Sequence, residues 1–426
     1  MFKKYFNSFF SLTLRMTTII SSFLFSWIVS RYFGAENAGA VFFYITLLTI
    51  LVTFSSQGAE IGIAKASARI DDKDKSRINA LFNYVLAKSY KLYLLIFPLL
   101  IVYLFYENLS FTQTLILIVA LFSVGICFVY MNVLSYLYQG LGNILMMILS
   151  QRTLFNFLSF IIIALFCFVF TEKNDNYNNI ALDKQIVLIS FAGLIAAMCF
   201  AIIYKKKYGR LKGIFKPEGF DDSCRQLFRI QILQLITMYG SQIIINFFAT
   251  KADIAGFIVS QRISTLLGFF VLAVSGVVSS QVSRAYSIKD FTSVQKYAFQ
   301  SFVFSASLGI PVGIILITFA KEFLAIFGSD FIQFYMVLIT LVISQMVNCL
   351  TGACDIVLMF IDGEKEHKRN VIIGTVIAIC LSLILIPFYS AIGAAIAATV
   401  SAVIVNVLDV ISIKQKAGFW IFNSKL

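Results

Sequence analysis

The chain has 426 residues, of which 60% are hydrophobic and 13% are charged, with a formal net charge of +13. Soluble globular chains carry about 25% charged residues and cover most of their surface with polar groups. The composition therefore excludes an ordinary soluble enzyme, a secreted disulfide scaffold and a disordered chain, and it indicates a polytopic membrane protein.

Twelve apolar segments follow one another along the chain. A hydrocarbon core of about 30 Å requires about 20 apolar residues of helix, whereas the strands of a β-barrel would be shorter and would alternate apolar with polar residues. The run from Leu115 to Val124 is nearly continuous in apolar residues and does not alternate. The sequence thus predicts an all-α integral membrane protein with twelve transmembrane helices. The segments are 11–33, 38–62, 83–106, 112–137, 144–170, 185–204, 228–249, 255–281, 297–320, 331–360, 371–388 and 391–413.

The basic residues predict the orientation of these segments. With the N-terminus on the cytoplasmic side, 25 Lys and Arg residues fall on that side and 5 on the other. Cytoplasmic loops carry the excess of basic residues, so we expect both termini to be cytoplasmic. The positive charge then faces anionic lipid headgroups, which is a better explanation of the net charge than nucleic-acid binding.

The chain divides into two halves of six segments. The connection at 205–229 is the longest and most basic, and we expect it to link an N-terminal lobe (1–204) to a C-terminal lobe (230–426). Glycines recur at matching places in the two halves: the separation of Gly39 from Gly256 is nearly equal to that of Gly140 from Gly363. Because six is even, both copies enter the membrane in the same sense, which predicts a parallel pseudo-two-fold repeat.

Catalytic and metal-binding motifs are scarce. The chain has one histidine, His367, in a charged loop, seven cysteines without CxxC spacing, and no phosphate-binding GxxxxGK[ST] loop. A zinc site, a Ser–His triad or nucleotide hydrolysis by a P-loop therefore has little support. We expect that the protein is not an enzyme and binds no cofactor or metal. A membrane-embedded polymerase or acyltransferase is the least favoured class, since the longest outer loop, near 171–184, is short and contains no histidine.

Several stretches resemble the polysaccharide-flippase branch of the multidrug/oligosaccharidyl-lipid/polysaccharide (MOP, MATE-like) exporter superfamily. They are Arg-Tyr-Phe-Gly-Ala-Glu-Asn-Ala-Gly at 31–39, Ala-Asp-Ile-Ala-Gly-Phe at 252–257 with Ser-Gln-Arg-Ile at 260–263, Gly-Glu-Lys at 363–365 and Ile-Gly-Ala-Ala-Ile-Ala-Ala-Thr at 392–399. The resemblance extends over nearly the whole chain in segment number and loop order. Among the members, O-antigen flippases of the Wzx type are the most similar in length and in the absence of extra domains.

This resemblance implies two six-helix lobes around a central cavity, alternating access, and an undecaprenyl-pyrophosphate-linked oligosaccharide as cargo. It places the protein in the bacterial cytoplasmic (inner) membrane. It also suggests the polysaccharide polymerase and chain-length machinery as partners, besides the membrane lipids. An exporter of cationic drugs from the same superfamily is the main alternative, and it would need carboxylates in the cavity.

Charged residues inside apolar segments are the candidate functional residues, because a charge at the centre of a bilayer costs about 2.5–3.5 kcal/mol on insertion scales. A guanidinium can bind two phosphate oxygens at once. We therefore expect cavity cations to contact the pyrophosphate, first Arg262 and Arg152, while Arg15, Lys88 and Lys91 could also snorkel to headgroups. Helix–helix hydrogen bonding is the alternative role for the arginines.

Three carboxylates are candidates for coupling transport to a proton or sodium gradient: Asp355, Asp409 and Glu60. Burial makes the charged form of a carboxylate costly, so such a group can exchange a proton or hold a cation. Pairing with a basic side chain or a hydroxyl is at least as well supported, and for Glu60 the nearby Lys65 is one such partner.

Overall fold

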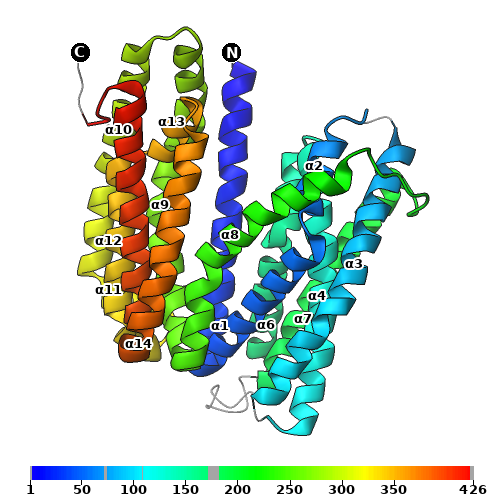
Figure 1. The fold of residues 1–426 in the computed structure, drawn as a ribbon. Helices are drawn as coiled ribbons and strands as arrows, with labels where there is room; N and C mark the ends of the chain where they lie inside the picture. Colours follow the sequence, from blue (N-terminus) through cyan, green and yellow to red (C-terminus); the bar gives the residue numbers. More distant parts are fainter. Residues whose placement is uncertain (1, 72–73, 108, 171–181, 423–426) are drawn as a thin grey trace. The chain divides into compact units, whose positions relative to one another are not determined.

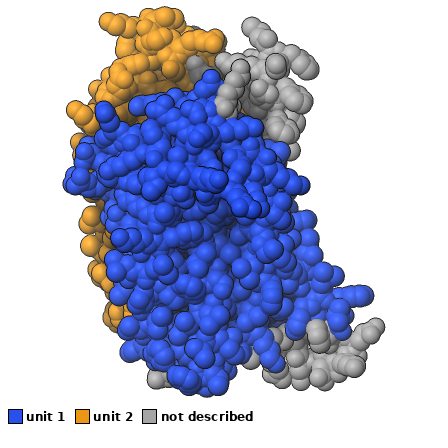
Figure 2. Space-filling model, turned by 90° about the vertical axis from the view of Figure 1, so that its right-hand side faces the viewer, with its two compact units in different colours: residues 1–235 blue, residues 236–426 orange. Residues whose placement is uncertain are grey.

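The computed structural model describes residues 2–71, 74–107, 109–170 and 182–422, and the side chains of 2–15, 170, 273, 276–277 and 280 lie outside this description. The described residues form helices and no strands, as predicted (Figure 1). The chain divides into two compact units, residues 1–235 and 236–426, which Figure 2 colours separately. The predicted lobe boundaries at 204 and 230 stay a prediction.

Unit 1 contains the first seven α-helices and part of the eighth. Within it, α4 packs against α7 and α3, α1 packs against α6 and α3, and the short helix α2 packs against α4. The elements are α1 (Phe2–Ser56), α2 (Ala59–Ser67), α3 (Lys75–Tyr106), α4 (Phe111–Gly140), α5 (Ile144–Ile148), the π-helical turn η1 (Leu149–Thr153), α6 (Leu154–Phe170), α7 (Leu182–Tyr208) and α8 (Phe220–Phe248).

Unit 2 begins inside α8 and contains the remaining helices. Within it, α9 packs against α10 and α12, α12 packs against α14, and the short α13 packs against α14. The elements are α9 (Lys251–Ser287), α10 (Phe291–Thr318), α11 (Ala320–Ala325), the 3₁₀ helix η4 (Ser329–Phe334), α12 (Tyr335–Thr351), α13 (Cys354–Phe360) and α14 (Glu364–Ala417).

Ten of the described helical stretches are long and apolar enough to cross a membrane, which makes this a multi-pass membrane protein. Two of them, 16–56 and 364–417, each cover two predicted segments. The chain bends at Gly34 in α1 and at Ser390 in α14. The halves of α14 lie side by side, because the Ser401 hydroxyl donates to the Gly374 carbonyl at 2.7 Å. The count of twelve spans stays a prediction.

Polar side chains fix where several helices begin. Ser110 and Gln113 form a capping box at the start of α4, and Thr250 and Asp253 form another at the start of α9. Each box satisfies amide groups that have no partner in the first turn of a helix. The Asp290 carboxylate caps α10 and accepts hydrogen bonds from the backbone amide and the hydroxyl of Ser293. These hydrogen bonds hold the pKa of Asp290 below its usual range. The helix boundaries thus follow from local sequence.

Two predicted single segments are interrupted. Segment 144–170 is broken by η1, and segment 331–360 is broken at Gly352, whose φ of 60° and ψ of −148° end α12. Glycine adopts such a conformation at low cost, because it has no Cβ. The Ala353 amide after this break donates to the Ser301 hydroxyl at 3.0 Å, so the freed backbone group has a partner.

A third interruption lies at Gly58, where a substitution can test how tightly unit 1 is packed. Gly58 has a φ of 78°, and a Cβ built there would lie 2.3 Å from the carbonyl oxygen of Cys224 in α8. We expect Gly58→Ala to lower the free energy of unfolding by about 2–4 kcal/mol, from backbone strain plus overpacking. Thermal unfolding of the purified protein in detergent measures the loss.

Gly142→Ala is the matched control. Gly142 has a φ of 71°, but nothing would lie within 4 Å of a Cβ at this position. The free energy of unfolding of this variant should therefore fall only by the cost of the strained backbone, about 1 kcal/mol. Equal losses in the two variants would mean that the contact between Gly58 and α8 contributes nothing.

Candidate functional site

Arg152 occupies a break in a helix of unit 1. Its backbone has a φ of 69° and a ψ of −7°, and the preceding Gln151 is also non-helical. A left-handed conformation costs a non-glycine residue about 1–2 kcal/mol, and such strain is concentrated at functional sites. The Thr153 hydroxyl donates to the Ile148 carbonyl at 2.8 Å, which satisfies an acceptor at the break.

The guanidinium of Arg152 is held by neighbouring helices. Its Nη2 donates to the hydroxyl of Thr49 at 2.8 Å, and its Cζ lies 4.7 Å from the ring centroid of Phe128. A cation over an aromatic face is stabilised by the quadrupole of the ring. The side chain is half-buried, and it lies within electrostatic range of the Glu60 carboxylate. The sequence singled out Arg152 but gave no sign of the break.

Glu60 is buried at the start of α2, with 2% of its surface exposed. Its two carboxylate oxygens accept hydrogen bonds from the side-chain amides of Asn132 in α4 and Gln231 in α8. The predicted pairing with Lys65 is not among these contacts. Glu60 therefore joins three helices of unit 1 through two neutral amides, and Arg152 lies within electrostatic range of it. Its role in coupling stays a prediction.

The other predicted cations of unit 1 have different surroundings. Lys88 forms an ion pair with Asp221 at 2.8 Å, and Asp221 also binds Lys216 at 2.6 Å. Lys91 is exposed on α3. The side chain of Arg15 lies outside the described residues. The pair with Asp221 ties Lys88 to the start of α8, and a role for either lysine in binding cargo stays a prediction.

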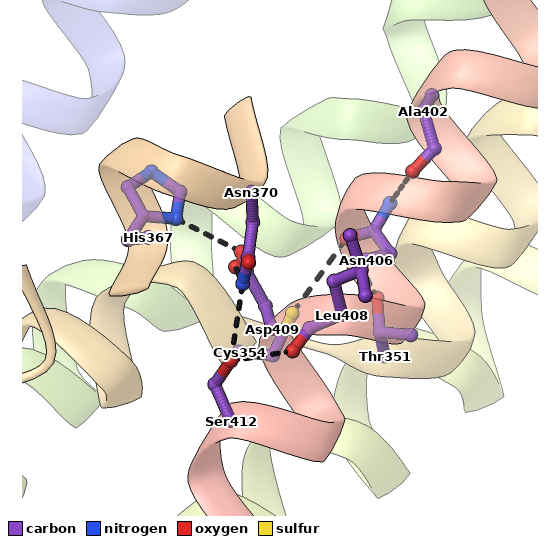
Figure 3. A network of polar contacts seen from close by, with 9 residues as sticks. All are labelled: Thr351, Cys354, His367, Asn370, Ala402, Asn406, Leu408, Asp409 and Ser412. Carbon is purple, nitrogen blue, oxygen red and sulfur yellow. Dashed lines mark hydrogen bonds and ion pairs between the residues drawn. The ribbon is translucent and has the colours of Figure 1, made fainter. Parts of the chain in front are cut away.

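In unit 2, Asp409 lies at the centre of a polar network (Figure 3). Only 1% of its surface is exposed. Its Oδ2 lies 2.9 Å from Nδ1 of His367, and its Oδ1 accepts a hydrogen bond of 2.8 Å from Asn370. Asn370 also donates to the hydroxyl of Ser412 at 3.1 Å. The network joins the two halves of α14, so it stabilises the bend between them.

A second group of polar side chains lies beside this network (Figure 3). Oδ1 of Asn406 accepts from the hydroxyl of Thr351 at 3.1 Å and from the thiol of Cys354 at 3.6 Å. Asp355, in the first turn of α13, is half-buried and within electrostatic range of Asp409 and His367. The structure thus brings together two of the three predicted carboxylates.

Sequence reasoning missed His367, which it placed in a charged loop. One signal was available: His367 and Asp409 lie on opposite sides of the bend at Ser390 and at comparable distances from it along the chain. In a helical hairpin, residues equally far from the bend lie at the same level. Arg262, in α9, is half-buried. Its role as a contact for the cargo stays a prediction.

Among the described residues, no group of three or more His, Cys, Asp or Glu side chains could hold a metal ion.

Comparison with known proteins gives the relatives of this chain. Residues 231–388 match the MatE family model. The "Probable low-salt glycan biosynthesis flippase Agl15" of Haloferax volcanii is 24% identical over 239 residues, which cover 53% of this chain and 48% of that protein. The match thus spans about half the length of this curated relative.

Solved structures agree over almost the whole chain. A multidrug resistance MATE family transporter of the MOP superfamily, in an inward-facing conformation, superimposes with a TM-score of 0.73 at 15% identity, covering 96% of this chain and 98% of that one. The lipid II flippase MurJ, in an inward closed conformation, gives 0.68 at 16% identity, covering 95% and 87%. The chain therefore has the fold of the MOP superfamily, as the resemblance implied. The O-antigen type stays a prediction.

The network around Asp409 predicts that removing this carboxylate lowers the free energy of unfolding more than removing the exposed carboxylate of Asp222. Asp409→Ala removes the acceptor of His367 and Asn370 and leaves buried donors without it, so we expect the free energy of unfolding to fall by about 1–3 kcal/mol. Thermal unfolding in detergent measures the change.

Asp222→Ala is the control, because Asp222 forms an ion pair with Arg225 in which both side chains are about three-quarters exposed. Exposed pairs of this kind contribute about 0–1 kcal/mol, so this variant should unfold close to wild type. If Asp409→Ala does likewise, the network does not stabilise unit 2.

Proposed function

We propose that this protein is a flippase that moves an undecaprenyl-pyrophosphate-linked oligosaccharide from the cytoplasmic to the outer leaflet of the bacterial cytoplasmic membrane. Two similarities support the proposal: one relative is a probable glycan biosynthesis flippase, and the lipid II flippase has the same fold. The cargo is the repeat unit of a surface polysaccharide such as O-antigen. Both termini face the cytoplasm, as the basic residues predict.

The observation that carries the proposal is the setting of Arg152. The backbone is strained at this half-buried cation, and Thr49 and Phe128 orient its guanidinium. A pyrophosphate carries about two negative charges. At an effective dielectric constant of 20, one contact at 4 Å contributes about 4 kcal/mol before desolvation. A few such contacts hold the headgroup without trapping it.

The transport cycle in this proposal is alternating access. Arg152, in unit 1, and Arg262, in unit 2, are the guanidinium groups assigned to the pyrophosphate. The carboxylates Glu60, Asp355 and Asp409 are the candidates for coupling to a proton or sodium gradient. The protein uses no organic cofactor, and it acts beside the polymerase and chain-length machinery that consume its product.

A deletion strain of the native host tests the function. Surface polysaccharide and lipid-linked oligosaccharides are quantified together. We expect surface polymer to disappear while complete pyrophosphate-linked repeat units accumulate on the cytoplasmic face. Normal export of repeat units in the deletion strain would contradict the proposal.

Substitution of Arg152 tests the site in the same strain at equal expression. Arg152→Ala should lower surface polysaccharide by about 10–100-fold, because hydrogen bonds to charged groups contribute about 1.5–3 kcal/mol. Arg152→Lys should also transport poorly, since an ammonium group cannot form the two-pronged contact. Arg229→Lys, at an exposed position of α8, is the matched control and should retain transport. Full transport by both Arg152 variants would show the assignment to be wrong.

Export of small cationic drugs is the second candidate function. The buried carboxylate of Glu60 favours it, because an exporter of cations needs a carboxylate and the hydrogen-bonding amides of Asn132 and Gln231 are neutral, although Arg152 lies within electrostatic range. A multidrug transporter is also among the proteins of the same fold. If the deletion strain exports repeat units normally and loses only drug tolerance, and Glu60→Gln has the same effect, this function replaces the flippase.

A further inference from the structure

A cavity at one end of unit 1 carries an unusual excess of positive charge. It has a volume of about 240 Å³ and lies between α2, the start of α3, the start of α8 and the chain before α8. Its lining contains three cations, Lys65, Arg69 and Arg77, and one carboxylate, Glu218. None of these residues is among those proposed to transport the cargo.

The N-terminus of α8 contributes to the same cavity. Gly219, Phe220 and Ser223 line it, and α8 is 29 residues long. The first amides of a helix and its dipole favour an anion, but Asp221 and Asp222 already lie in the first turn of α8. The selection for an anion therefore comes from the three basic side chains of the lining, which outnumber its one carboxylate, and a phosphate group fits such a lining.

The cavity wall is held in place without a ligand. The side-chain amides of Asn79 and Asn83 donate to the carbonyls of Arg210 and Gly213 at 2.5 and 2.9 Å. The Phe215 amide donates to a carbonyl of α3, and Arg77 stacks over the Phe215 ring at 4.3 Å. An anion would thus meet a wall that is already ordered, so little conformational entropy is lost on binding.

The segment that forms this wall also has the composition of a segment that lies at a membrane surface. Leu211 and Ile214 are 40% and 77% exposed, and they alternate with basic residues between Lys205 and Lys216. Apolar side chains that enter the headgroup region, together with basic ones that attract anionic lipid, are typical of interfacial segments. This favours a lipid over a soluble metabolite as the ligand of the cavity.

We propose that the cavity around Lys65, Arg69 and Arg77 binds the phosphate group of an anionic phospholipid at the membrane surface. None of the residues assigned to the cargo lines this cavity, and the site does not depend on the identity of the cargo. Its bound lipid fastens the chain before α8 to the bilayer.

Native mass spectrometry of the full-length protein in detergent tests this site, with phosphatidylglycerol as the probe and phosphatidylcholine as the neutral comparison. The double variant K65Q/R69Q should weaken the binding of the first phosphatidylglycerol molecule by about thirtyfold, since each cation near a lipid phosphate contributes about 1 kcal/mol. Binding of phosphatidylcholine should not change. Arg77 is kept because its stack on Phe215 supports the wall.

K368Q/R369Q is the matched control. It removes the same charge, one Lys and one Arg, from exposed positions of α14 that do not line the cavity and lie outside the basic stretch 205–216. We expect its affinity for phosphatidylglycerol to stay within about twofold of wild type. Equal weakening in both double variants would mean that the lipid responds to the overall charge of the surface, and the proposal would be wrong.

A gain of affinity gives a test that misfolding cannot imitate. Glu218→Gln removes the carboxylate from the cavity and should strengthen phosphatidylglycerol binding by about fivefold. Inorganic pyrophosphate distinguishes the source of the phosphate group. If pyrophosphate binds the wild type and K65Q/R69Q abolishes that binding while lipid retention is unchanged, the ligand is soluble and the lipid assignment is overturned.

Discussion

Backbone amides and carbonyls have no water to bind inside a hydrocarbon layer, so every break in a helix must find partners within the protein. This constraint explains where the polar side chains of the chain lie. The break at Arg152 is satisfied by the Thr153 hydroxyl, and the break at Gly352 by the Ser301 hydroxyl. Glu60 and Asp355 each lie in the first turn of the short helix that follows a break. The breaks are therefore the places where charge can be kept inside an otherwise apolar protein.

The two units share their helix starts and differ in their breaks. The capping residues of α3 and α10, Asp74 and Asp290, have nearly the same separation along the chain as the glycines that indicate a repeat. With that separation, the positions equivalent to Gly352 fall inside α4, and those equivalent to Arg152 fall inside the first half of α14, where the helix is continuous. The polar residues of each unit therefore lie in a different helix.

The sequence predicted the fold well because hydropathy acts on whole segments. All-α architecture and long apolar helices follow from segment length and hydropathy, and the superfamily fold was implied by a resemblance in motifs and segment order. The candidate site was less accessible, because its geometry depends on contacts between distant segments. Nothing in Leu-Ser-Gln-Arg-Thr at 149–153 marks a helix break, since it contains neither proline nor glycine. The pairing of His367 with Asp409 requires the bend at Ser390, and the partners of Glu60 come from residues 72 and 171 positions away. Composition identified which charges are costly, and only the structure identified their partners.

The anchoring of the chain before α8 has a consequence for how this protein tolerates change. Asn79 and Asn83 bind carbonyl oxygens of Arg210 and Gly213, which every amino acid possesses. The side chains of Leu211 and Lys212 can therefore vary, whereas the length of the stretch cannot. Gly213 itself is restricted by its φ of 74°. One inserted residue between 210 and 213 would move a carbonyl out of register with its asparagine, while a substitution at 211 or 212 would not. The short stretch between the two anchors is accordingly a poor place to insert an epitope tag or a fluorescent reporter.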